Sequence, residues 1–168
     1  MKSNDKKKSD QRAHLNAEYA NLLLFRLLEI LYDSKGKGAK FRTCILGKED
    51  FVQYYRNKGL RFTTRRWEEN RDRCRDFLRH LGIIQNLSCA IEKNVAQIQF
   101  SSCIHYPAEK MLMKEEVPPY TCICANHLAL GIEKATGKQT EIAKIESGEE
   151  ACRVKMLLFE QSKDEGGD

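Results

Sequence analysis

Apolar residues recur with a helical period in three stretches of the first half of the chain. These stretches are residues 17–33, 48–59 and 65–81, and each predicts a helix. The first is apolar on nearly every side, so we expect it at the centre of the core or against a partner chain. Its broad apolar face carries Tyr19, Leu23, Leu27, Ile30 and Leu31.

The pattern then changes to the alternation typical of strands. Two hairpins are predicted, with a fourth helix between them and a loop-like, proline-bounded bridge before that helix. Helices set apart from hairpins indicate an α+β fold, with four main helices packed on an antiparallel sheet made of two hairpins. The predicted ranges are 83–92 and 95–104 for the first hairpin, 106–120 for the bridge, 121–136 for the helix, and 139–146 with 151–160 for the closing hairpin.

Length and composition indicate one domain in a chain of 168 residues. We expect residues 15–161 to form a single ligand-binding domain, between disordered polar tails at 1–14 and 162–168. The residues are 41% hydrophobic and 32% charged, and no run reaches the roughly 18 apolar residues that span a bilayer. No apolar stretch follows the first lysines, so a cytoplasmic location is expected.

Cysteine and histidine gather in residues 103–152. Zinc takes four thiolate, imidazole or carboxylate ligands in a tetrahedron. Cys103 and His105 are two apart on a predicted strand and share one face, while Cys124 and His127 are three apart and share a helical face. These spacings permit a metal site, but they also suit buried thiols, which is the usual environment of free cysteine.

Cys122 and Cys124 follow two prolines and open the predicted fourth helix. Partial positive charge at a helix start stabilises a thiolate and lowers its pKa. A thiol-dependent redox role is therefore an alternative, with His127 as a possible base for Cys124. No Gly-x-Gly-x-x-Gly loop follows a predicted strand, so nucleotide-dependent reductase chemistry is not indicated and we expect a non-catalytic protein.

The third predicted helix is rich in charge, with six arginines and four acids interleaved. A solvated face with internal ion pairs accounts for this pattern. The alternative is a winged-helix-like DNA-binding regulator that uses residues 64–81. The balanced charge of this helix and a net charge of only +5 disfavour nucleic acid as a partner.

Three stretches, taken together and in order, resemble the 4-vinyl reductase domain family over about residues 17–159. Residues 54–83 look like its short helix, glycine, long helix and glycine, and 98–110 like its strand running into a cysteine. Residues 121–152 look like its cysteine-bearing helix and closing hairpin. The resemblance implies a fold related to TRAPP-type vesicle-tethering subunits, and binding or sensing of a small hydrophobic molecule, often by a dimer.

The resemblance also implies a structural zinc ion, because phenol-sensing members hold zinc beside the ligand pocket with three cysteines and a glutamate. Carried across, the ligands fall on Cys152, on Glu141, and on Cys122 or Cys124. A four-residue loop in the closing hairpin would place Glu141 opposite Met156, roughly 10 Å or more from Cys152. A shared site would then need a bulge or a larger loop.

Lys144 departs from the family pattern, because it occupies the position of the remaining cysteine and cannot replace a thiolate ligand. Either zinc is not bound, or Cys122 and Cys124 both bind it, or Cys103, His105 or His127 supplies the missing ligand.

A ligand pocket is expected between the helices and the sheet, although aromatics at such spacing are also ordinary core. The expected partners are a small hydrophobic ligand, a second copy bound through the first helix, and a separate effector protein. The candidate pocket residues are Tyr54, Phe62, Trp67, Phe77 and Phe100.

Overall fold

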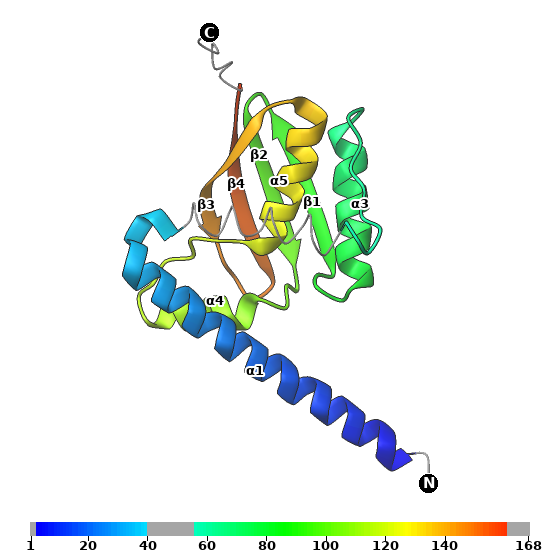
Figure 1. Ribbon diagram of the computed structural model, residues 1–168, viewed down its shortest axis with the longest axis vertical. Helices are drawn as coiled ribbons and strands as arrows, with labels where there is room; N and C mark the ends of the chain where they lie inside the picture. Colours follow the sequence, from blue (N-terminus) through cyan, green and yellow to red (C-terminus); the bar gives the residue numbers. More distant parts are fainter. Residues whose placement is uncertain (1–2, 40–55, 161–168) are drawn as a thin grey trace.

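A computed structural model describes residues 3–39 and 56–160 of the chain, and Figure 1 shows the arrangement of its elements. The helical elements are α1 (Ser3–Lys35), the short 3-10 helix η1 (Gly36–Gly38), α3 (Trp67–His80), α4 (Tyr106–Lys114) and α5 (Ile123–Thr136). The strands are β1 (Asn86–Glu92), β2 (Val95–Ser101), β3 (Gln139–Glu146) and β4 (Ala151–Phe159).

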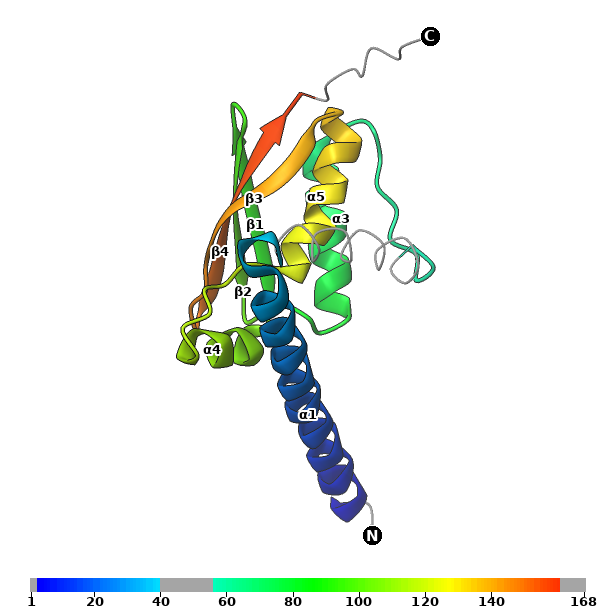
Figure 2. The ribbon, with the colours of Figure 1, turned by 60° about the vertical axis from the view of Figure 1, so that its left-hand side comes forward.

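The strands form one antiparallel sheet in the order β1-β2-β4-β3, so the two hairpins join through β2 and β4. Helices α3 and α5 lie side by side on one face of the sheet, while no described helix covers the other face (Figure 2). The predicted α+β fold, with helices on a sheet of two hairpins, is confirmed.

The main core lies between the sheet and the pair α3 and α5, because alternate strand residues point to that face. Each of β1, β2 and β4 alternates buried and exposed positions, and α5 is buried along most of its length. The largest side chains of this core are Leu78, Phe100, Leu128, Ile132 and Met156.

A buried asparagine joins α3 to α5. Asn70 is fully buried, and its side-chain amide donates to the carbonyls of Gly131 at 2.7 Å and Thr63 at 2.8 Å. The Thr63 N–H donates back to Asn70 Oδ1 at 2.8 Å. Buried amides need such partners, so these bonds fix the approach of the two helices.

Gly131 is the point of closest approach, and Gly131→Ala is expected to destabilise the fold. An added Cβ would lie 3.1 Å from Asn70 Cβ and 3.2 Å from Phe62 Cε1. Overpacking costs about 1–3 kcal/mol, against roughly 1 kcal/mol gained in helix propensity, so urea unfolding should show a net loss of about 1 kcal/mol. Adding Phe62→Leu should restore part of it, whereas a stabilised single variant would contradict the close contact.

The first helix differs from its prediction in length. It begins at Ser3, not near residue 17, because the polar residues before it are mostly good helix formers. Among residues 18–35, whose burial is described, Phe25 is buried at 4% exposure, while Tyr19 and Ile30 are more than 60% exposed. Leu23 and Leu27 are exposed as well, so most of the predicted apolar face lies away from the core of its own chain. The domain limits 15–161 stay a prediction.

Helix α4 lies in the bridge that was predicted to be a loop. Pro107 falls in its first turn, where a missing N–H is tolerated. With α1 it builds a second apolar cluster, separate from the main core. The buried members are Phe25, Ala108, Leu112 and Val117, with Leu24, Leu28, Tyr32, Met111 and Tyr120 packed around them.

Two further element predictions meet the structure only in part. The predicted helix 48–59 falls mostly outside the described residues, and its last residues form a turn. Strand β2 ends at Ser101, because Ser102 takes a left-handed conformation with φ of 50°. The predicted strand 95–104 was therefore three residues too long, and Ile104 at its end is 47% exposed. Within the described ranges, no helix is both long and apolar enough to cross a membrane.

Candidate thiol site and adjoining cavity

Two cysteines meet where β2 ends and α5 begins. Cys103 lies on the connection from β2 to α4, and Cys124 is the second residue of α5. Their Sγ atoms are 4.0 Å apart. We call these two residues the outer thiol pair, because Cys103 is only half-buried while Cys124 is 1% exposed.

The two thiols of the outer pair have opposite pKa shifts. The pKa of Cys103 is lowered, chiefly by the hydrogen bond from Cys124 and further by the backbone N–H groups of His105 and Tyr106. The pKa of Cys124 is raised well above its ordinary value by the same hydrogen bond and by burial. When one thiol of the pair is ionised, Cys103 is therefore the thiolate and Cys124 keeps its proton.

A second pair lies deeper. The thiols of Cys122 and Cys152 are hydrogen-bond partners, and both residues are 4% exposed. This contact and burial raise the pKa of Cys122 well above its ordinary value. Cys74 and Cys89 are buried in the main core, where burial raises the pKa of each to about 12. Free cysteines outside residues 103–152 are expected to be small core residues. Cys74 and Cys89 are such residues, and Cys44 lies outside the described residues.

Glu141 is not brought to the cysteines. It pairs with Leu157, five residues along β4 from Cys152, which is roughly 17 Å along the strand. Leu157 also points to the face of the sheet opposite to Cys152, because neighbouring strand positions alternate. The closing hairpin pairs Glu146 with Arg153, because its loop is longer than the four residues expected. A bulge between Ile142 and Lys144 then moves the pairing back by one position, which leaves Glu141 opposite Leu157. The predicted metal role of Glu141 beside Cys152 was therefore wrong.

Lys144 is likewise remote from the thiols. It pairs with Lys155 and forms a 2.6 Å ion pair with Glu146 on the exposed face of the sheet. Its side chain is 66% exposed. Lys144 is therefore not part of the cysteine cluster, and its difference from the family pattern does not change the surroundings of the thiols.

The remaining candidates do not complete a metal centre. Among residues 3–39 and 56–160, no three side chains of Cys, His, Asp or Glu are placed to hold one ion. The cysteines instead form two separate pairs. The residues that were expected to share one zinc ion are thus not gathered around a single point, and their role as ligands stays a prediction. They are Cys122, Cys124, Cys152 and the substitutes Cys103, His105 and His127.

His127 is buried, and His105 is half-buried. His127 is 1% exposed on α5, and burial lowers its pKa to about 4, with His105 adding a smaller effect. Burial also lowers the pKa of His105, on the β2–α4 connection. Both imidazoles are neutral at pH 7.

The predicted aromatic residues serve as core. Phe100 is fully buried between the sheet and the helices, and Phe62 and Trp67 pack against the same cluster. Phe77 is half-buried on α3, and Tyr54 lies outside the described residues. None of the four described aromatics lines the small cavity beside the thiols.

That cavity lies between α1, α4 and the connection from α4 to α5, and we call it the α1–α4 cavity. Its volume is about 20 Å³, room for roughly one water molecule. The Thr121 hydroxyl is buried without a hydrogen-bond partner. The lining residues are Leu24, Leu28, His105, Ala108, Glu109, Leu112, Pro119, Tyr120, Thr121 and Ile123.

Glu109 and Thr121 were missed by sequence reasoning. Glu109 is 7% exposed and accepts a hydrogen bond from Ser147 Oγ, and burial raises its pKa. An acid in a segment taken for a loop gives no signal of burial. Only the apolar spacing of Ala108, Leu112 and their neighbours could have indicated a helix that buries it.

A larger open groove of about 680 Å³ lies on the exposed face of the sheet. Gln97, Gln99, Arg153 and Lys155 are among its lining residues. It is open to solvent, carries several charged side chains and lies on the opposite face from the outer thiol pair, so it does not suit a small apolar ligand.

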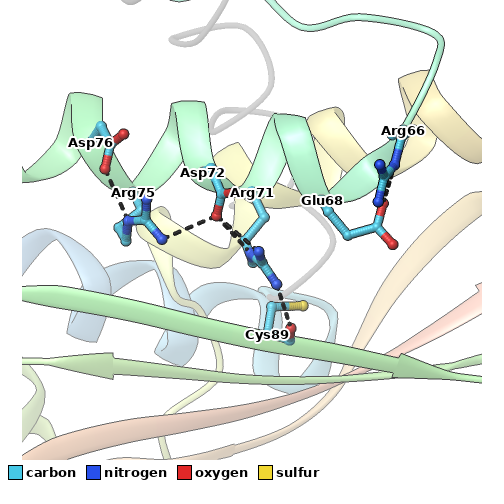
Figure 3. A network of polar contacts seen from close by, with 7 residues as sticks. All are labelled: Arg66, Glu68, Arg71, Asp72, Arg75, Asp76 and Cys89. Carbon is cyan, nitrogen blue, oxygen red and sulfur yellow. Dashed lines mark hydrogen bonds and ion pairs between the residues drawn. The ribbon is translucent and has the colours of Figure 1, made fainter.

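Arg71 and Arg75 of α3 are paired with acids on the same helix, and Arg66, just before the helix, is paired with Glu68 (Figure 3). Asp72 contacts Arg71 at 2.9 Å and Arg75 at 3.0 Å, and Arg75 also contacts Asp76. These contacts are the internal ion pairs that the interleaved charges predicted. Arg71 further donates to the Cys89 carbonyl at 3.4 Å, which ties α3 to the sheet.

A family model described as the putative rubredoxin C-terminal domain matches residues 20–161, which is most of the chain and nearly all of the described fold. The chain belongs to this family. The family name points to a metal such as iron, while the described residues bring no three candidate ligands together around one ion. No curated protein matches the chain.

Proposed function

We propose that this rubredoxin C-terminal-type domain binds a small, mostly apolar molecule that carries one polar group, in the α1–α4 cavity. The buried Thr121 hydroxyl carries this proposal. An unpaired buried hydroxyl costs about 1–3 kcal/mol, so a ligand that pairs with it gains that energy on binding. Apolar walls with a few converging polar groups are typical of small-molecule sites.

The polar groups of the cavity suit a hydroxyl or carbonyl on the ligand. Glu109 offers a carboxyl group whose pKa burial raises, and His105 offers a neutral imidazole. Each can donate or accept one hydrogen bond in its neutral form. A phenol or a short alcohol has the matching chemistry, whereas a strongly charged ligand would be desolvated at high cost.

The cavity must widen for such a ligand, because 20 Å³ holds only about one water. Helix α1 is the element that can move. Its described contacts are with α4 and the adjoining segments, and the Tyr120 hydroxyl donates to the Leu28 carbonyl at 2.7 Å. Displacing α1 would open the second apolar cluster and leave the main core intact.

The resemblance to the 4-vinyl reductase domain family supports the same function, since its members bind small apolar molecules. A homodimer fits the exposed apolar stripe of α1, because a second copy would cover it with an equal stripe. The stripe residues are Tyr19, Leu22, Leu23, Leu27 and Ile30. A separate effector protein would receive the signal, and neither zinc nor catalysis is required.

Thr121→Val is expected to stabilise the free protein by about 1 kcal/mol and to weaken phenol binding about tenfold. Valine has nearly the same shape and removes the unpaired hydroxyl, which costs stability when empty and contributes affinity when a ligand pairs with it. Urea unfolding and calorimetric titration with phenol measure the two effects.

Thr136→Val is the matched control, because the Thr136 hydroxyl already donates to the Ile132 carbonyl and lies outside the cavity. It should lower stability and leave phenol affinity unchanged. If Thr121→Val instead lowers stability and phenol does not bind the parent protein, the cavity holds a structural water and the binding function is wrong.

A further inference from the structure

We propose that Cys103 and Cys124 are a redox-active pair, which a hydroperoxide oxidises to a disulfide between the β2–α4 connection and the start of α5. This property goes beyond the binding function and does not depend on it. The Sγ atoms are 4.0 Å apart, and a disulfide bond is about 2.05 Å long. Oxidation therefore requires the sulfurs to approach by about 2 Å.

The backbone around Cys103 permits this approach. The pairing of β2 with its neighbours ends at Ser101, and helix α4 begins only at Tyr106. Ser102 has a φ of 50°, which costs a residue other than glycine about 1 kcal/mol. This turn directs Cys103 toward α5, and a shift of its side chain breaks no strand pairing.

The two cysteines have different roles because their surroundings differ. Cys103 is half-buried and within reach of a small oxidant, while Cys124 is 1% exposed. The lowered pKa of Cys103 favours a thiolate, although the nearby Glu109 carboxylate opposes it, and Cys124 keeps its proton. A thiolate attacks oxidants and a neighbouring thiol resolves the product, so Cys103 attacks and Cys124 resolves.

The chemistry balances with a hydroperoxide as oxidant. The Cys103 thiolate attacks the distal peroxide oxygen, the O–O bond breaks, and the leaving alkoxide or hydroxide takes up a proton from solvent. This yields a sulfenic acid on Cys103. Cys124 then attacks that sulfur, the S–O bond breaks, and the Cys124 proton leaves with the hydroxyl as water. Two thiols and one hydroperoxide thus become one disulfide, one alcohol or water, and one further water.

The tryptic map of this chain separates the alternatives. Cys103 lies in peptide 94–110, Cys122 and Cys124 lie in 115–134, and Cys152 lies in 145–153. The reduced full-length protein is treated with stoichiometric hydrogen peroxide, blocked with an alkylating reagent, digested without reductant and analysed by mass spectrometry. We expect most of the protein to lose two hydrogen masses and to link 94–110 with 115–134.

Peptide 115–134 contains both Cys122 and Cys124, so substitutions decide which of the two is bonded to Cys103. Cys124→Ala should lower the yield of this cross-link at least tenfold and leave sulfenic or sulfinic acid on Cys103, while Cys122→Ala should retain it. A cross-link that survives Cys124→Ala would make Cys122 the partner and overturn the pair. Wild-type protein that links only 115–134 with 145–153, or that forms sulfinic acid on Cys103 without a cross-link, would overturn it as well.

Discussion

His127 alone is expected to cost the domain about 3 kcal/mol of stability as the pH falls from 7 to 4. Its pKa in the fold is about 4, against 6.5 ordinarily. Between those values the unfolded chain binds the proton and the folded chain does not, so stability decreases as pH falls through this window. A difference of about 2.5 units is roughly 3 kcal/mol at 1.36 kcal/mol per unit. Urea unfolding at a series of pH values measures the slope.

His127→Gln should flatten this dependence, because glutamine does not titrate. Two neighbouring groups make the comparison with the variant necessary. The lowered pKa of His105 acts in the same direction, while the raised pKa of Glu109 makes the folded state bind a proton more readily and opposes it. His80→Gln, at an exposed position, is the control and should leave the slope unchanged. An unchanged slope in His127→Gln would show that His127 is not held neutral by burial.

Cys103 is expected to react with iodoacetamide at pH 8 at least about fifty times faster than Cys74 or Cys89. A thiol with a pKa of about 12 is a thiolate in roughly one molecule in ten thousand at that pH, against about one in ten for an ordinary pKa of 9. The lower-pKa thiolate is intrinsically less nucleophilic, by about twentyfold over three units. The expected ratio of alkylation rates is therefore about fiftyfold, and the burial of Cys74 and Cys89 increases it further.

Pulsed alkylation followed by peptide mapping measures each rate in the same sample, because Cys103 and Cys89 fall in different tryptic peptides. The Cys103 rate should reach half its maximum below pH 9, since its pKa is lowered. Cys124→Ala removes the hydrogen bond that contributes most and should move this midpoint upward. Equal rates for Cys103 and Cys89 would contradict the geometry of the outer thiol pair.

Strand and helix periods were enough to predict the sheet of two hairpins, α3 and α5. Ala96, Ile98 and Phe100 repeat at every second position of β2, and burial of one sheet face follows directly from that alternation. The same periodicity left the packing of α1 open, because a helix that is apolar on nearly all sides does not reveal which side is covered. Phe25 is buried because α4 lies against it, and α4 itself was hidden behind a proline that its first turn tolerates.

The sequence indicated which residues belong to the candidate site better than it indicated how they are arranged. The cysteines and histidines of residues 103–152 do gather at one end of the sheet, as their bunching along the chain indicated. Their partition into the Cys103–Cys124 and Cys122–Cys152 pairs could not be predicted, since it depends on contacts between segments far apart in the chain. Nothing in the sequence indicated that Glu109 and Thr121 are buried, because the burial of a polar residue depends on neighbours that only the tertiary structure brings to it.

The sequence by itself determined the periodicity of the elements, the α+β class and the concentration of thiols in the last third. These properties are local, because they depend on residues a few positions apart. The tertiary structure decided which face of α1 is covered, which thiols meet, and that Glu141 lies across the sheet from Cys152. Those outcomes depend on one bulge, one short helix and the crossing of α3 and α5 at Gly131, where packing and not periodicity sets the geometry.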